Sequence, residues 1–425
     1  MKKKTAIICL TILLSGSLRC FAQLTIEECY RKTQANYPLI QQYDLIEKTK
    51  EYNLSNVNKG YLPQIDFSAK ASYQSEVTQI PIDFSRLGIN GISIPVLSKD
   101  QYGTTIDINQ TIWDGGSIKS QKEQIETAAE VERKNIEVNI YSINKRVNQL
   151  FFGILLTDAQ IEQNRLLKED LKRNYEQISS YMQNGIANQA DLDAIKVDLL
   201  NTEQTTIQLT STRKAYTEML SRLIGEKLDS ETELIKPSPE HNSSRSINRP
   251  ELSLYEAQIR NYEAQNSQLV SGIMPKIGIF ATGGYGKPGL DMLKTDFSAY
   301  YIVGARLTWK IGNFYTKKNS KKTIQANIKS IETQRNTFLF NTRLEITEKE
   351  NNIDRYTEQL KYDNEIIELK TSIRKAAEAK MANGTISGTD LARDINAEQT
   401  AKQNRILHEM ELLLAIYDLK FATNN

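Results

Sequence analysis

Hydrophobic residues recur with a helical period along two long stretches of this chain. The first stretch contains six aliphatic positions separated alternately by four and three residues, which is the spacing of a coiled-coil seam: Ile136, Ile140, Ile143, Val147, Leu150 and Ile154. No proline occurs in residues 96–236 or 289–425, so neither stretch contains the residue that most often ends a helix. The pattern predicts unbroken helices at 117–183 and 316–382, each roughly 100 Å long.

A polar turn and a second helical pattern follow each long helix. After Gly185 the apolar period resumes and continues to Leu223, just before Gly225. Glycine is typical of a helix end, and an acidic residue stabilises the N-terminus of the next helix. The elements expected from this pattern are a tip at 184–191 with a helix at 191–225, and a tip at 383–390 with a helix at 390–420.

Apolar and polar residues alternate with a period of two just before each long helix. The first such segment places Ile65, Phe67 and Tyr73 on one face, and Asp66 and Lys70 on the other. This alternation predicts strands with two unlike faces. The expected strands lie at about 61–73, 103–113, 276–285 and 299–311, and the second pair follows a helix expected at 250–271.

The order of strands and helices occurs twice, and the sequence itself repeats. At the tips, a shift of 199 positions superimposes Gly185 and Asp191-Leu192 on Gly384 and Asp390-Leu391. Upstream of the strands the shift is 212 positions. Such self-similarity indicates duplicated structural units. We therefore expect two repeats, at 23–236 and 237–425.

The N-terminus has the pattern of a secretory signal peptide. Lys2, Lys3 and Lys4 precede an apolar run, and Ala22 lies at the small-residue position of a cleavage site. Removal of residues 1–22 would change the formal net charge from +2 to −2, which leaves no basic excess for nucleic-acid binding. Lipidation at Cys20 is the weaker alternative, because an arginine precedes this cysteine.

Residues suited to catalysis or metal binding are scarce. The mature chain would keep two histidines, His241 and His408, and one cysteine, Cys29. These are too few for an internal disulfide or a typical His and Cys metal site. The acidic residues follow helical surface spacing. We expect no enzyme activity, cofactor or metal, since a carbohydrate- or metal-processing enzyme would need polar side chains that converge in space.

The four strands are long enough to cross an outer membrane at a tilt, which takes about 9–11 residues, but closed bacterial barrels begin at about eight strands. The chain must therefore share strands with copies of itself, or its sheet is soluble and covers a core. Residues expected to face lipid are Ile65, Phe67, Tyr73, Ile106, Ile108, Tyr301, Val303, Leu307 and Trp309. Residues expected to face water are Asp66, Lys70, Asp107, Asn109, Arg306 and Lys310.

Several segments of the mature chain are distinctive: 24–38, Gly60-Tyr61-Leu62-Pro63 at the entry to the first strand, Trp113-Asp114-Gly115-Gly116 at the start of the long helix, and the two tips. In these segments the mature chain resembles the TolC family of outer-membrane efflux proteins. The resemblance implies a mainly helical fold with a small β part, built from two repeats. It further implies a homotrimer in the outer membrane of a Gram-negative bacterium, in which a 12-stranded β-barrel is continued by a 12-helix tunnel in the periplasm.

The resemblance also implies a function, partners and sites. The protein would be the passive exit duct of a tripartite efflux or secretion system, with energy supplied by an inner-membrane pump. The tips would form the periplasmic entrance and dock an adapter protein through Gly185, Asp191, Leu192, Gly384, Asp390 and Leu391. In the family, the aspartate equivalent to Asp390 is often followed three residues later by another acid near the closed end of the tunnel. This chain has Arg393 at that position and Asp394 next to it. The residues expected at a constriction are therefore Asp390, Arg393 and Asp394, which do not form a purely acidic ring.

A periplasmic coiled-coil adapter or stalk protein without a pore is the main alternative. It would explain the coiled-coil spacing and the export signal. It would not explain the duplicated strand pairs or the nearly equal lengths of the two long helices.

Overall fold

The computed structural model describes residues 24–78, 96–229, 232–240 and 246–425. The expected signal peptide, residues 1–22, and His241 lie outside these described residues. The described residues form two compact units, which we describe separately: those within 1–41, 136–250 and 337–425 form unit 1, and those within 42–135 and 251–336 form unit 2. Two long helices, α4 (Ser117–Gln183) and α7 (Asn313–Ala382), contribute residues to both units.

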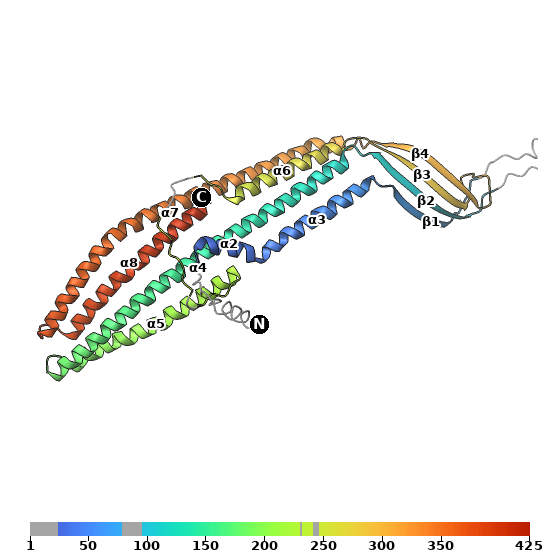
Figure 1. The fold of residues 1–425 in the computed structure, drawn as a ribbon. Helices are drawn as coiled ribbons and strands as arrows, with labels where there is room; N and C mark the ends of the chain where they lie inside the picture. Colours follow the sequence, from blue (N-terminus) through green and yellow to red (C-terminus); the bar gives the residue numbers. More distant parts are fainter. Residues whose placement is uncertain (1–23, 79–95, 230–231, 241–245) are drawn as a thin grey trace, which may run out of the picture. The chain divides into compact units, whose positions relative to one another are not determined.

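The order of elements repeats, as Figure 1 shows. The first half contains α2 (Ile26–Asn36), the short 3-10 turn η1 (Pro38–Ile40), α3 (Gln41–Asn58), the 3-10 turn η2 (Lys59–Tyr61), β1 (Gln64–Tyr73), β2 (Asp100–Trp113), α4 (Ser117–Gln183) and α5 (Gln189–Ile224). The second half contains α6 (Pro250–Ser271), β3 (Lys276–Lys287), β4 (Ser298–Thr308), α7 (Asn313–Ala382) and α8 (Gly388–Thr423).

Several element ends differ from the sequence prediction. β1 begins at Gln64 rather than near residue 61, because Lys59–Tyr61 forms a 3-10 turn and Pro63 has no N–H to pair. β4 ends at Thr308, three residues before the expected end, because Ile311 already donates a turn hydrogen bond to the carbonyl of Trp309. α7 begins at Asn313 rather than at 316, immediately after this turn.

The helices after the tips also begin earlier than expected, α5 at Gln189 and α8 at Gly388. Their N-cap residues are Asn188 and Ser387, so the aspartates that follow occupy the third helical position and not the first. This position lets each carboxylate accept a hydrogen bond from the N-cap backbone, which completes a capping box.

The core of unit 1 is built from α2, α4, α5, α7 and α8. Its fully buried side chains include Val147, Phe151, Leu220 and Ile416, and α2 adds Cys29. Helices α4 and α5 approach closely at Gly153, where a Cβ atom would lie 2.9 Å from Cε2 of Tyr216. This close contact explains why α4 tolerates the one glycine in its interior.

A second apolar cluster of unit 1 lies under the two tips. α4 and α5 contribute Leu171, Ile178, Leu192 and Ile195, and the helices of the other hairpin contribute Ala377, Met381, Leu391, Ala392 and Ile395. Residues from both repeats therefore share one core at this end of unit 1. In Figure 1, α5 runs beside α4 and α8 runs beside α7 up to these tips.

Unit 2 contains a four-stranded antiparallel sheet in the order β1-β2-β3-β4 (Figure 1). The ladder between β2 and β3 joins the two repeats, with Ile108 opposite Ala281. In the same unit, α6 packs on α4, where Ser120 Oγ and Ser271 Oγ share a hydrogen bond of 2.9 Å.

The junction between β2 and α4 has a capped helix start. The Asp114 carboxylate accepts hydrogen bonds from the backbone N–H groups of Gly116 at 2.9 Å and Ile118 at 2.5 Å. Gly115 has a φ of +68°, and a Cβ atom there would lie 2.6 Å from Cβ of Met274. An acid at this position complements the positive end of the helix dipole.

Candidate functional site: a two-faced sheet and paired hairpin tips

The sheet of unit 2 has one continuous apolar face. Its register places Phe67 opposite Ile106, Ile108 opposite Ala281, and Ala281 opposite Val303. Side chains two residues apart share a face, so this side collects most of the apolar strand residues: Ile65, Phe67, Ala69, Ala71, Tyr73, Tyr102, Ile106, Ile108, Ile279, Ala281, Tyr285, Ala299, Tyr301, Val303, Ala305 and Leu307. The larger of these side chains are exposed, for example Val303 at 70% and Phe67 at 71%.

The opposite face of the sheet is polar. It carries Asp66, Lys70, Asp107, Asn109 and Arg306, as the strand register requires. The Asp107 carboxylate accepts hydrogen bonds from Thr282 Oγ1 at 2.5 Å and from Thr105 Oγ1 at 3.1 Å. The sheet therefore separates an apolar surface from a hydrogen-bonded polar surface.

Aromatic residues mark both ends of the sheet. At the loop end, the Phe297 ring stacks on Tyr285 with centroids 5.6 Å apart and on Tyr102 at 6.4 Å. At the helix end, Trp113 ends β2, and Trp309 follows β4 and donates from Nε1 to the Ile273 carbonyl at 3.0 Å. Aromatic belts at the two ends of an apolar band are typical of membrane interfaces.

Within the described residues, β1 and β4 each pair on one side only. Each thus presents an unpaired strand edge beside exposed apolar side chains. Such an edge is a template for pairing with another strand.

Both hairpin tips of unit 1 end their long helix in the same way. At the first tip, Gly185 donates to the Met182 carbonyl at 3.1 Å and Ile186 donates to the Tyr181 carbonyl at 2.9 Å. The second tip repeats this pattern around Gly384. This pair of hydrogen bonds is a Schellman motif, which needs a left-handed residue, and the φ angles of Gly185 and Gly384 are +74° and +65°.

A capping box then starts each following helix. Asn188 Oδ1 accepts from the backbone N–H of Asp191 at 3.1 Å, and Ser387 Oγ accepts from that of Asp390 at 3.2 Å. Hydrogen bonds from the Ser387 side chain and backbone lower the pKa of Asp390, with a further contribution from Arg393. This carboxylate is therefore charged at neutral pH.

The two tips contact each other through Asp191. Its Oδ1 accepts a hydrogen bond of 2.7 Å from the backbone N–H of Gly388, the first residue of α8. A Cβ atom on Gly388 would lie only 2.6 Å from Cβ of Asp191, so the contact requires glycine. Ile186 also lies beside the other tip, with Cγ2 3.5 Å from the position of a Cβ on Gly384.

The structure separates the six predicted docking residues into two groups. Gly185 and Gly384 are exposed, and Asp390 is half-exposed. Asp191 is buried at 4% exposure, and both leucines belong to the apolar cluster under the tips. Sequence reasoning missed Ile186, which is 44% exposed between the two glycines; its position directly after Gly185 was the available signal.

The three predicted constriction residues lie together on the first turns of α8. Arg393 approaches Asp390 at 3.8 Å and Asp394 at 3.9 Å, so one cation lies between two carboxylates. The Arg393 side chain is 74% exposed, and both contacts are long. This arrangement is a mixed-charge surface and not an acidic cluster.

A buried charge network that the sequence analysis did not identify lies further along α8. The Glu398 side chain is 4% exposed and accepts from Arg374, from Lys402 at 2.9 Å and from Thr371 at 2.8 Å. Burial alone would raise the pKa of Glu398, but the hydrogen bonds from Lys402, Thr371 and Arg374 outweigh it and lower the pKa. The network fixes α7 against α8 below the tips.

The helices of the described chain do not include one with the length and apolar character needed to cross a bilayer. In the same residues, no group of three or more histidine, cysteine, aspartate or glutamate side chains is placed to hold a metal ion.

Comparisons with known proteins agree with this geometry. Residues 29–226 match the family model of outer membrane efflux proteins. No curated protein sequence matches the chain significantly. Among solved structures, the outer-membrane channel OprN aligns with 94% of this chain and 89% of its own, at 13% identity and a TM-score of 0.70.

Two further solved structures are similar over nearly the full length. The outer membrane protein VceC from Vibrio cholerae aligns at 12% identity and a TM-score of 0.68, covering 94% of this chain and 96% of its own. The CmeC outer membrane channel from Campylobacter jejuni aligns at 14% identity and a TM-score of 0.65, covering 94% and 85%. Residues 29–226 are therefore similar to the outer membrane efflux protein family, and the chain has the mainly helical, TolC-like fold of these channels.

Proposed function

We propose that this protein is the outer-membrane exit channel of a tripartite efflux or secretion system. The two-faced sheet carries the proposal. Its apolar face is suited to lipid, its polar face is suited to water, and its aromatic ends match the two interfaces of a membrane. A soluble sheet would need a core to cover the apolar face, whose large side chains are exposed in unit 2.

The open edges of the sheet support assembly as a homotrimer. Unpaired N–H and C=O groups in lipid are costly, so β4 of one copy must pair with β1 of the next until the barrel closes. Three copies give twelve strands, which exceeds the minimum of about eight. The helices of three copies would continue this barrel as a tunnel in the periplasm.

The paired tips support a role as the periplasmic entrance that docks an adapter protein. Gly185, Ile186 and Gly384 form a small, exposed surface where the backbone of a partner can approach closely. The adapter would link the channel to an inner-membrane pump that supplies the energy. Asp390, Arg393 and Asp394 would line the entrance, and the channel itself would perform no covalent chemistry.

Residues 1–22 would direct export of the chain as a signal peptide and would then be removed. The mature protein would reside in the outer membrane of a Gram-negative bacterium. The solved proteins with this fold include several described as outer-membrane channels, among them OprN and CmeC. A periplasmic stalk without a pore remains the alternative function, but it gives no role to a sheet with one lipid-like and one polar face.

Membrane fractionation and conductance test the proposal. We expect the protein in the outer-membrane fraction as a trimer that dissociates only on heating, and we expect ion-conducting steps when it is added to a planar lipid bilayer. A soluble periplasmic monomer, or a membrane-bound protein without conductance, would refute the channel function.

A further inference from the structure

The start of α7 carries a dense group of basic residues. No acidic residue occurs between Asp296 and Glu332, whereas seven basic residues occur there: Arg306, Lys310, Lys317, Lys318, Lys321, Lys322 and Lys329. We call Lys317, Lys318, Lys321 and Lys322 the lysine patch. Within the described residues, no carboxylate pairs with these four, and the first paired lysine of the segment is Lys329, 3.0 Å from Glu332.

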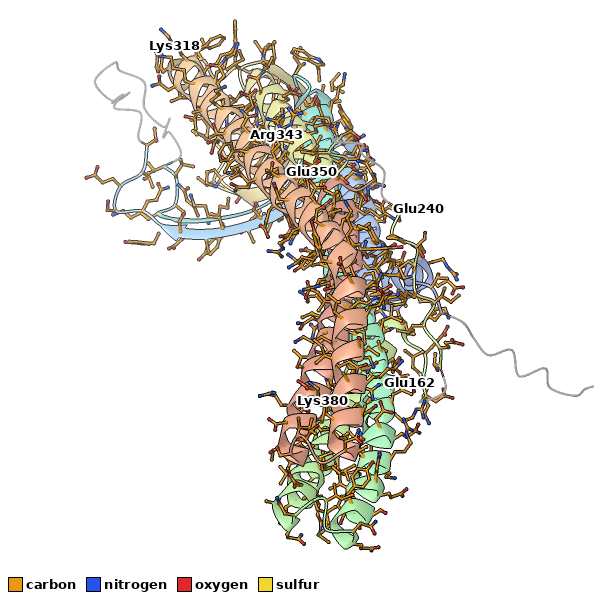
Figure 2. All side chains as sticks on the ribbon, turned by 90° about the vertical axis from the view of Figure 1, so that its left-hand side faces the viewer. Glu162, Glu240, Lys318, Arg343, Glu350 and Lys380 are labelled. Atoms are coloured by element: carbon orange, nitrogen blue, oxygen red, sulfur yellow. The ribbon has the colours of Figure 1, made fainter. Side chains whose placement is uncertain are left out.

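The lysine patch adjoins exposed aromatic side chains. Phe314 is 44% exposed and Tyr315 is 83% exposed in the first turn of α7. Lys318 lies three or four residues after these aromatic residues, and Lys321 and Lys322 lie three and four residues after Lys318. These side chains therefore lie along one face of the helix. Figure 2 shows Lys318 extending outward from this end of α7.

The helix dipole does not explain the lysine patch. The N-terminus of a helix is its positive end and its influence falls off within about one turn, so it offers no attraction to the four lysines, which lie in the second and third turns of α7. The first turn of α7 has no acidic residue to compensate. An external anion would compensate for this accumulation of positive charge.

The first repeat provides an internal comparison. Trp113 lies four residues before α4 and Trp309 lies four residues before α7. The next residue is Asp114 in the first repeat, where it caps the helix, and Lys310 in the second. Since both junctions connect a strand of the same sheet to a long helix, the fold alone does not require the reversal of charge.

We propose that the lysine patch, with Phe314 and Tyr315, binds anionic phospholipid headgroups in the periplasm-facing leaflet of the outer membrane. This inference rests on the proposed function, which puts the helix end of the sheet at that interface. The apolar face of β4 continues into exposed Trp309 and Ile311 before the patch begins. Aromatic residues followed by clustered lysines are the arrangement that recognises an anionic membrane surface.

The two tryptophans make the proposal testable, because they are the only ones in the chain and report on the two junctions separately. In W113F, fluorescence comes from Trp309 beside the patch; in W309F, it comes from Trp113. Each variant is reconstituted in vesicles of phosphatidylcholine mixed with brominated phosphatidylglycerol or with brominated phosphatidylcholine. We expect stronger quenching of Trp309 by the brominated phosphatidylglycerol, and equal quenching of Trp113 by both lipids.

Charge variants in the W113F background identify the residues responsible. K317Q/K318Q/K321Q/K322Q should reduce the relative affinity for phosphatidylglycerol by about tenfold, as should high salt. The corresponding four Arg substitutions keep the charge and should retain the preference. The control K361Q/K370Q/K375Q/K380Q removes the same charge further along α7 and should also retain it.

The possible results separate this inference from the proposed function. If both lipids quench Trp309 equally, or if the Gln variant keeps the preference as a heat-resistant trimer, the lysine patch does not bind lipid. If neither brominated lipid quenches either tryptophan, the strands are not in the membrane, and the channel proposal fails together with this one.

Discussion

The backbone N–H of Gly388 donates a hydrogen bond of 2.7 Å to Oδ1 of Asp191, although the two residues lie 197 positions apart. The other oxygen of the same carboxylate accepts from the N–H of Asn188 at 3.1 Å. One buried side chain therefore stabilises the N-termini of both α5 and α8. It also holds the tips of the two repeats together, so that the exposed glycines form one surface.

Replacement of Asp191 by alanine should loosen this junction. The change removes the capping box of α5 and leaves the Gly388 N–H buried without a partner, which we expect to lower the free energy of unfolding by about 1–3 kcal/mol. Hydrogen exchange of residues 384–392 should become faster. The control is D193A, which removes a nearby exposed carboxylate that bonds only the Gln189 side chain in the described structure. Equal exchange in both variants would contradict the role of Asp191.

The docking role of the tip glycines can be tested with two substitutions that separate the effect of backbone strain from the effect of side-chain size. Gly185 has a φ of +74°, and a Cβ atom there would meet nothing within 4 Å, so G185A and G185W share a strain of about 1 kcal/mol but differ in size. Only G185W should block an approaching adapter helix. We expect assembled trimers for both variants and loss of adapter co-purification and of export for G185W. Normal export by G185W would show that the tip is not the docking surface.

The buried network at Glu398 predicts a pH dependence. The pKa of Glu398 is lowered from 4.5 in the folded protein, so the unfolded chain takes up this proton first as the pH falls. The contribution of the network to stability is therefore present above pH 4.5 and is lost below it. E398Q should unfold more easily at neutral pH, by about 3 kcal/mol, because the buried negative charge that pairs with Arg374 and Lys402 is lost.

Thermal unfolding across this pH range checks the prediction. The melting temperature of E398Q should fall less than that of the unmodified protein when the pH drops below 4.5. E368Q, which changes an exposed glutamate on α7, serves as the control. Parallel curves for E398Q and the unmodified protein would show that other carboxylates dominate the acid sensitivity.

Cys29 should be chemically inert in the folded protein. Burial raises the pKa of its thiol to about 12, with a smaller opposing contribution from Lys32, and the side chain is fully buried in α2. The reactive thiolate is therefore almost absent at neutral pH. A maleimide reagent should label the mature protein only after denaturation, as mass spectrometry would detect. Rapid labelling of the folded protein would mean that α2 detaches readily from the core of unit 1.

The helices and the fold class could be predicted because their signals are local. Long proline-free stretches, coiled-coil spacing and a duplicated strand–helix order all lie within single segments, and the TolC-like, mainly helical fold is confirmed. The tips show the limit of this reasoning. Asp191 and Asp390 occupy equivalent sequence positions, but one is buried by the opposite hairpin and the other is half-exposed. The hydrogen bond between Asp191 and Gly388 joins residues 197 positions apart, so the local spacing of apolar and polar residues could not predict it.

The orientation of the sheet can be tested with two neighbouring residues of β4. Val303 belongs to the apolar face and is 70% exposed, whereas Ile302 lies on the polar face opposite Thr282. Lysine on a lipid-facing strand position costs about 2–4 kcal/mol near the middle of the bilayer, whereas lysine toward a water-filled lumen is tolerated. V303K should therefore reduce the yield of heat-resistant trimer in the outer membrane, and I302K should assemble normally with altered ion selectivity. Because the two changes add the same charge to adjacent residues, a difference in assembly isolates the face on which the lysine lies. Equal assembly would indicate that neither face meets lipid, and damage by I302K alone would reverse the assignment of the two faces.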